Sequence, residues 1–272
     1  TSDAFFGNFI AVQTPGALNT PVTWFVLYVL LNAVVVLCGV EKGIEKVSRV
    51  MMPVLVILSM VIAGYSLTLP GAMDGLKFYL LPRWEDFSIF TVLGAMGQLF
   101  YSMSLAMGIM ITYGSYMQKD NILEHSVTQI EVFDTGIAIL AGLMIIPAMV
   151  AFSGGDTTLV QQSAGPGLMF GVLPKVFESM AFGGFIGTIF FLLVLLAALT
   201  SSISLMETIV SIVVDKLHIG RKAATVGVIV GVLGLGMLSC LGYGPLEAIQ
   251  PLGMAFLDFF DSVSYTHLRA HE

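Results

Sequence analysis

Three hydroxyl residues stand side by side at 200–202, in the middle of a long apolar run that covers residues 192–214. A hydroxyl group in the apolar interior of a membrane costs free energy unless it has a partner. Small hard cations prefer oxygen ligands, and a backbone carbonyl one helical turn earlier can add one more. We therefore expect a cation site here, formed by Ala197, Thr200 and Ser201. The alternative is that the hydroxyls bond back to the preceding turn.

A second apolar run, 88–117, is interrupted between Gly97 and Gly108 by small and flexible residues, with Ser102 and Ser104 among them. Such a segment can unwind, and unwound backbone exposes carbonyl groups to a cation while half-helix N-termini attract anionic groups. That combination suits a zwitterion, such as an amino acid that travels with Na⁺. Close packing of two helices through small residues is the competing interpretation.

Three acidic residues lie in or at the end of apolar runs. Asp134 begins an uncharged stretch that continues to Pro147, and a carboxylate inside a membrane marks an ion or proton path by default. A position near the membrane surface, as a helix cap, is the alternative. Glu207 is interpreted as a polar residue satisfied within a helix bundle. Asp215, next to Lys216 at the cytoplasmic end, either forms an ion pair at a gate or is solvated.

The composition predicts an integral membrane protein. Of 272 residues, 57% are hydrophobic and 11% are charged, whereas a soluble domain carries about 25% charged residues. Spanning helices need roughly 20 apolar residues. The chain offers seven candidates, at 21–40, 50–69, 88–117, 127–152, 184–214, 224–241 and 246–264.

The distribution of basic residues predicts the orientation of these spans in the cell membrane. If the loop at 39–49 is cytoplasmic and the spans alternate, seven basic residues fall inside and three outside. The inside set is Lys42, Lys46, Arg49, Lys119, Lys216, Arg221 and Lys222, and the outside set is Lys77, Arg83 and Lys175. The expected location is therefore the inner (plasma) membrane, as a multi-pass protein.

Three segments resemble the neurotransmitter:sodium symporter family in its bacterial branch: GQLFYSMSLAMGIMITYGSYM (97–117), DTGIAILAGLMIIPAMVAF (134–152) and LAALTSSISLMETIVSIVVDKL (196–217). The loop at 39–53 and the GPGLMFGVLP motif at 165–174 support the resemblance. It implies an all-α, inverted-repeat helical bundle of which this chain forms one domain, 1–264. It also implies that the chain covers the family's fourth to tenth helices, with the first three missing.

Carried over by position, the resemblance implies a set of functional residues. Ser102 and Asp134 would belong to a first sodium site, and Ala197, Thr200 and Ser201 to a second. Gln98 would lie beside the chloride or gate region, with Asp215 and Asp261 as the cytoplasmic and extracellular gate acids. The amino-acid pocket would be lined by Tyr101, Ser102, Ser104, Met107, Ser201 and Leu205.

Two departures from the family pattern refine this expectation. Asp134 stands where chloride-dependent members have asparagine, and Ala138 matches their chloride-binding serine. A built-in carboxylate can supply the charge that chloride otherwise brings, so transport is expected to need Na⁺ at two sites and no chloride. Met107 stands where some members have an aromatic residue. With Leu205 it suggests a soft apolar pocket for a hydrophobic or aromatic amino acid.

Other functions remain as alternatives. A proton-coupled or other cation-coupled transporter of the same architecture is the nearest, and an inactive fragment is another. A membrane enzyme is not expected, because the four histidines all lie outside the predicted spans and no second aspartate matches Asp134 in a facing span. A channel is not expected either, because no pore loop is repeated. The mostly polar residues 265–272 follow an apolar run abruptly and are interpreted as a non-native tail, the alternative being that the last helix ends early.

Overall fold

The computed structural model describes residues 2–13, 16, 20–39, 45–105, 107–117, 122–158 and 168–269, which form helices and turns with no strand among them. Short helical turns lie at Trp84–Asp86 (η3), Leu168–Val172 (η4) and Pro251–Gly253 (η5). The longer helices are α1 (Ser2–Ile10), α2 (Pro21–Leu37), α3 (Lys46–Leu67), α4 (Ala72–Leu80), α5 (Ile89–Ser102), α6 (Ile109–Ser115), α7 (Leu123–Phe152), α10 (Leu173–Glu178), α11 (Gly183–Leu217), α12 (Arg221–Leu241) and α13 (Phe256–Arg269).

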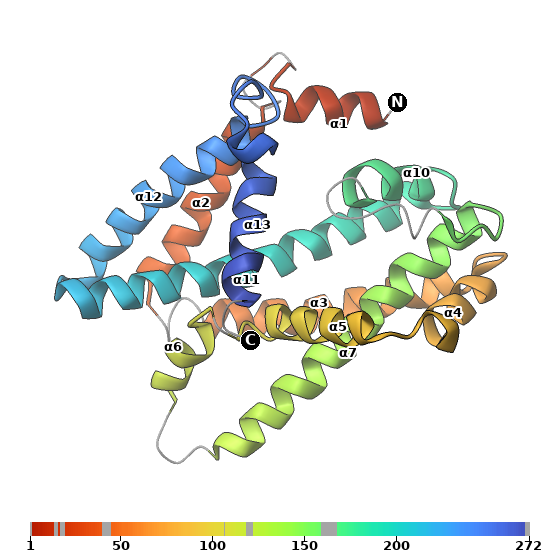
Figure 1. Ribbon diagram of the computed structural model, residues 1–272, viewed down its shortest axis with the longest axis horizontal. Coiled ribbons are helices and arrows are strands. Elements are labelled where there is room, and N and C mark those ends of the chain that lie inside the picture. The colour runs from red at the N-terminus through yellow and green to blue at the C-terminus, as the bar shows by residue number, and fades with distance from the viewer. Residues whose placement is uncertain are drawn as a thin grey trace.

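Helix α11 joins two separate hydrophobic cores. It has 35 residues, so at 1.5 Å per residue it is about 50 Å long and exceeds the apolar thickness of a bilayer, roughly 30 Å. Its first half packs with α3, α7 and α10, around Phe190 and Met149. Its second half packs with α2 and α12, around Val210 and Val36. Figure 1 shows α11 running through the molecule, with α2 and α12 along one part and α10 beside the other.

Helix α4 packs closely on the second half of α7, at positions where both helices have glycine. A Cβ atom on Gly75 would lie 2.7 Å from the Cα of Pro147, and one on Gly142 would lie 2.1 Å from the ring of Tyr79. The sequence predicts only an external connection over residues 70–87. The structure has helix α4 there. Because Gly75 and Gly142 lack side chains, the backbones of α4 and α7 can approach each other closely.

The long apolar helices agree with the predicted spans in part. Among the described residues, four helices are long and apolar enough to cross a membrane, while α2 and α5 are apolar but shorter. The four are Ser48–Leu67, Leu123–Phe152, Gly183–Leu217 and Arg221–Leu241. The interruption predicted in the third span is confirmed, since α5 ends at Ser102 and α6 begins at Ile109. Gly97 lies inside α5, so the break is shorter than the sequence suggests.

The start of the last predicted span is wrong. The sequence predicts a helix over 246–264, but residues 242–248 form turns, η5 follows at Pro251, and α13 begins only at Phe256. Pro251 has no N–H to continue a helix, and Leu252 adopts a left-handed conformation with φ of 53°. Helix α13 continues past 264 to Arg269. The side chains after 264 and residues 270–272 lie outside the described part of the chain, so the interpretation of 265–272 as a tail stays a prediction.

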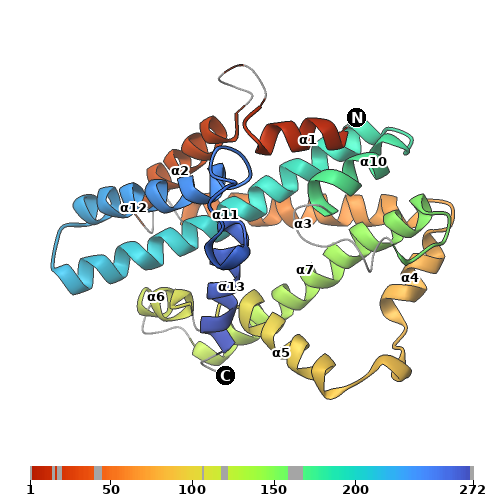
Figure 2. The ribbon, with the colours of Figure 1, turned by 45° about the horizontal axis from the view of Figure 1, so that its top comes forward.

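The predicted cap after α7 is partly helical, with η4 and α10 in succession. The GPG turn at 165–167 and residues 40–44 of the basic loop at 39–49 lie outside the described residues. Helix α10 packs against both α7 and α11, so this segment belongs to the first core. Figure 2 shows η4 and α10 alongside one end of α11, with α1 close by.

Candidate functional site

The break between α5 and α6 brings two predicted site residues together. Ser102 is the last residue of α5, and its hydroxyl donates a hydrogen bond of 2.6 Å to Oδ1 of Asp134 on α7, 32 positions away in the sequence. The chain leaves α5 through Ser104, with φ of 54°, and enters α6 through Gly108, with φ of 77°. These left-handed residues end one helix and redirect the next. A carboxylate and a hydroxyl thus meet at an interrupted helix.

The second predicted cation site lies on one face of α11. The hydroxyl of Thr200 donates a hydrogen bond of 2.9 Å to the carbonyl of Ala197. This is the back-bonding that the sequence left as an alternative. It does not remove the oxygens as ligands, because a hydroxyl that donates its hydrogen still has lone pairs and a carbonyl has two. Ser201 follows by one position and is exposed, so its hydroxyl is open to a ligand or to another element.

This second set of residues lies where the two cores meet. Ala197 packs against the first core, and Ile203 already belongs to the second. Between them α11 carries hydroxyl groups instead of large apolar side chains. Within the described residues, no hydrogen bond joins Ser102 or Asp134 to Ala197, Thr200 or Ser201. The residues predicted for the first sodium site thus lie on α5 and α7, and those predicted for the second lie on α11.

The residues predicted to line the amino-acid pocket lie on α5, on the break and on α11. Tyr101 is 40% exposed and Leu205 is 44% exposed, while Ser104 and Met107 are partly buried. Helix α6 contacts α11, where the hydroxyl of Tyr113 lies 3.0 Å from that of Ser204, whereas α5 packs against α13. Among the described residues, the second half of the broken helix thus packs on α11, while the main contact of the first half is with α13.

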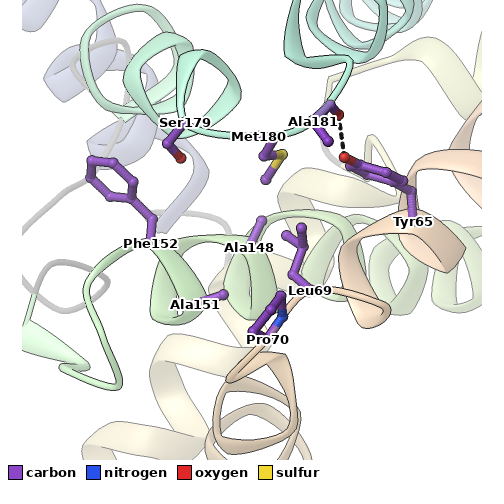
Figure 3. Close-up of a pocket in the computed structure, with 9 residues that line it drawn as sticks. All are labelled: Tyr65, Leu69, Pro70, Ala148, Ala151, Phe152, Ser179, Met180 and Ala181. Atoms are coloured by element: carbon purple, nitrogen blue, oxygen red, sulfur yellow. Dashed lines mark hydrogen bonds between the residues drawn. The ribbon is translucent and has the colours of Figure 1, made fainter.

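A cavity of about 330 Å³ lies elsewhere, between the end of α3, the end of α7 and the turn from α10 to α11. Figure 3 shows Phe152 and Ser179 on one side of it and Tyr65 on the other, where the Tyr65 hydroxyl donates to the carbonyl of Ala181. No residue of the predicted pocket lines this cavity. It is lined by Tyr65, Leu69, Pro70, Ala148, Ala151, Phe152, Ser179, Met180 and Ala181.

The three predicted gate residues are all exposed. Gln98 lies on α5, Asp261 on α13 and Asp215 near the end of α11. No ion pair of Asp215 is present in the described part of the chain, and its role in a gate stays a prediction.

Glu207 forms the strongest polar contacts in this part of the molecule. It is fully buried, and its two carboxylate oxygens accept hydrogen bonds from the two amino groups of Arg221, at 2.8 and 2.5 Å. The hydroxyl of Tyr116 on α6 donates to the same carboxylate at 2.7 Å. Arg221 also donates to the carbonyl of Val36 at the end of α2. The sequence predicted a satisfied glutamate but not its partners, because the contact depends on how α6 and α12 pack on α11.

Comparison with known proteins identifies the family. Residues 5–268 match the model of the sodium:neurotransmitter symporter family. The chain belongs to this family. A relative from Bacillus subtilis (strain 168), named uncharacterized sodium-dependent transporter YhdH, is 38% identical over 237 residues, covering 86% of this chain and 51% of that protein. An uncharacterized sodium-dependent transporter of Haemophilus influenzae is 34% identical over 250 residues, covering 90% of this chain and 53% of that protein.

The fold also matches a solved structure of this family. The crystal structure of MhsT in complex with L-phenylalanine superimposes with a TM-score of 0.82 at 36% identity, over 98% of this chain and 58% of that one. The predicted all-α helical bundle and multi-pass membrane location are therefore confirmed. This symporter family and the relatives named above are transporters and not enzymes. The chain spans about half the length of the curated relatives it matches.

Proposed function

We propose that the complete protein moves an amino acid across the membrane together with sodium, by alternating access. The observation that carries the proposal is the hydrogen bond between Ser102 and Asp134, which places an anionic oxygen at a broken helix in a chain of the sodium:neurotransmitter symporter family. A broken helix lets one site bind a cation and a zwitterion together. Sodium bound from outside would order the break and favour substrate binding, after which the bundle rocks to release both inside.

Two sodium sites support this cycle. The first uses Ser102 and Asp134, and the second uses the Ala197 carbonyl with the hydroxyls of Thr200 and Ser201. The first carries a negative charge and lies at the break, so it is suited to couple sodium to substrate. The second has only neutral oxygens and lies on α11 between the parts of that helix that pack in the first and the second hydrophobic core. A sodium ion bound there would couple the positions of the helices around the first core to those around the second.

The substrate proposed is a hydrophobic or aromatic amino acid. Met107 and Leu205 would form the apolar part of a pocket whose polar part is Ser102, Ser104 and Ser201, with Tyr101 beside them. MhsT has been crystallised with L-phenylalanine, and this chain shares its fold. The carboxylate of Asp134 supports chloride-independent transport, because it already provides negative charge beside the first site. Gln98, Asp215 and Asp261 are proposed to act in the gates.

Uptake of a radiolabelled amino acid into proteoliposomes tests this function. The complete protein is compared with Asp134→Ala and Ser201→Ala, with and without a sodium gradient. We expect sodium-driven uptake of a hydrophobic amino acid, unaffected by replacing chloride with gluconate and lost in both variants.

Matched controls come from the same helices. Ser126→Ala on α7 and Thr188→Ala on α11 each remove a hydroxyl whose hydrogen bond in the described part of the chain goes to its own preceding turn, so they are expected to retain uptake. Uptake that follows a proton gradient and ignores sodium would replace the proposal with a proton-coupled transporter. Uptake that survives both site substitutions would refute the assigned sites.

A further inference from the structure

A buried amide on α2 lies directly behind the second candidate sodium site. Helix α2 is almost wholly apolar, yet it carries Asn32, which is only 1% exposed. The side-chain oxygen of Asn32 accepts a hydrogen bond of 2.8 Å from the hydroxyl of Ser202 on α11. Its side-chain nitrogen donates at 2.8 Å to the carbonyl of Tyr28, one turn earlier on α2.

Tyr28 completes the arrangement. Its hydroxyl lies 2.8 Å from the hydroxyl of Ser202. The single hydroxyl hydrogen of Ser202 can go to the Asn32 oxygen at 2.8 Å or to the Leu199 carbonyl at 3.1 Å, and since neither of these can donate in return, the Tyr28 hydroxyl is the natural donor to Ser202. Tyr28, Asn32 and Ser202 thus form a polar ring that joins α2 to α11 through side chains whose hydrogen bonds satisfy one another. A satisfied polar group in an apolar setting is costly to displace, because moving it leaves donors and acceptors unpaired.

The apolar contacts around this ring do not by themselves fix the rotation of α11. Around the polar ring, Val29, Ala33 and Val36 of α2 and Ile203 and Met206 of α11 belong to one apolar core. Apolar contacts have little directional preference, whereas a single buried amide can set the register of two packed helices. Successive residues of a helix point about 100° apart, so a slip of one position would turn Ser201 toward Asn32.

From this geometry we propose that Asn32, with Tyr28, is a positioning residue for the second sodium site. By holding Ser202, it fixes the rotation of α11 so that Ser201, Thr200 and the Ala197 carbonyl face away from α2 toward the bound cation. Asn32 and Tyr28 do not touch the ion. This inference rests on the proposed function, because it assumes that these α11 oxygens bind sodium.

The test measures the sodium concentration that gives half-maximal uptake in proteoliposomes of the complete protein, at saturating amino acid. Asn32→Leu keeps the approximate volume and removes both hydrogen bonds, Ser202→Ala removes the α11 partner, and Tyr28→Phe removes one hydroxyl only. We expect the half-saturating sodium concentration to rise about three- to tenfold for the first two variants and less for the third. Ser202→Thr, which keeps the hydroxyl, should restore a value near that of the unmodified protein.

A merely structural role would give a different pattern. Ser59→Ala is the control, because Ser59 is equally buried on α3 and bonds only to the carbonyl of Leu55. It should leave the half-saturating sodium concentration unchanged whatever its effect on thermal stability. For the ring variants, the KM for the amino acid at saturating sodium should change less than the half-saturating sodium concentration, since the three ring residues are outside the proposed amino-acid pocket and Ser201 alone belongs to both sites.

The outcomes separate the inference from the function on which it rests. Lower thermal stability with an unchanged sodium response in Tyr28→Phe and Ser202→Ala would overturn the positioning role and leave the symporter intact. A response of the unmodified protein that is independent of sodium would overturn both. If Asn32→Leu does not fold, the graded pair Tyr28→Phe and Ser202→Ala still decides the question.

Discussion

The carboxylate of Glu207 on α11 and the guanidinium of Arg221, the first residue of α12, form a buried ion pair that joins the two helices. The glutamate is fully buried, whereas the Arg221 side chain is 32% exposed. Both carboxylate oxygens are paired with the guanidinium, and Tyr116 adds a third hydrogen bond. A buried pair of this kind is stable only when both charges and their remaining hydrogen bonds are satisfied. Val36 of α2 and Tyr116 at the end of α6 meet part of that condition, whereas Nε of Arg221 has no hydrogen-bond partner among the described residues.

The difference in exposure predicts unequal effects when the pair is broken. Arg221→Met leaves a carboxylate without a cation in a fully buried position and should cost about 3–5 kcal/mol of folding stability. Glu207→Gln leaves a guanidinium that can turn to water, and the new amide can still accept a hydrogen bond, so the loss should be smaller. Thermal denaturation of the purified protein in detergent measures both.

The double variant Glu207→Gln/Arg221→Met checks the cause of this effect. It should be more stable than Arg221→Met alone, because no buried charge remains. Additive losses in the double variant would show that the two side chains stabilise the protein independently.

Tyrosine hydroxyls hold α6 against α11 at two points, Tyr113 to Ser204 and Tyr116 to Glu207. The double substitution Tyr113→Phe/Tyr116→Phe keeps the rings and removes both hydrogen bonds. We expect faster hydrogen exchange over residues 109–117, because this short helix then opens more often, and unchanged exchange in the middle of α12. Mass spectrometry of peptic fragments provides the measurement. Equal exchange in α6 before and after substitution would mean that apolar packing alone holds it.

Close packing of α4 on α7 predicts that Gly75 does not tolerate a side chain. In Gly75→Ala the new methyl group would meet the backbone of Pro147, which cannot turn aside, so we expect a loss of about 1–3 kcal/mol. Gly64→Ala on α3 is the control, since nothing lies within 4 Å of its position for a Cβ, and it should be neutral or slightly stabilising. Thermal denaturation of the two variants compares them, and equal midpoints would contradict the close approach.

The proposed role of Asp134 as a built-in negative charge predicts a change in ion requirement. In Asp134→Asn/Ala138→Ser the carboxylate is removed and a hydroxyl is supplied at the position that matches the chloride-binding serine. Uptake by this variant should depend on chloride, with a several-fold loss when gluconate replaces it. Uptake by the unmodified protein, assayed in parallel, should not depend on chloride. A variant that transports equally well without chloride would show that Asp134 is not the source of the charge.

Much of the fold was predictable because the spanning helices of a membrane protein are visible in its sequence as long apolar runs. The runs at 50–69, 127–152, 184–214 and 224–241 all became helices near those bounds. The broken third span was also predictable, since glycine and serine in an apolar run weaken a helix where no water can replace its hydrogen bonds. The last span was misplaced because hydropathy does not detect the turns around Pro251, where the residues remain apolar although the backbone is not helical.

The sequence by itself determined which residue types could bind a cation and that they lie in membrane-embedded helices, because polar groups inside apolar runs are conspicuous. Only the tertiary structure decided which of them meet. The contact of Ser102 with Asp134, the pair of Glu207 with Arg221, and the polar ring of Tyr28, Asn32 and Ser202 each join residues that are distant in sequence or lie on different helices. Such contacts depend on the rotation and crossing of whole helices, which the periodicity of one helix cannot fix.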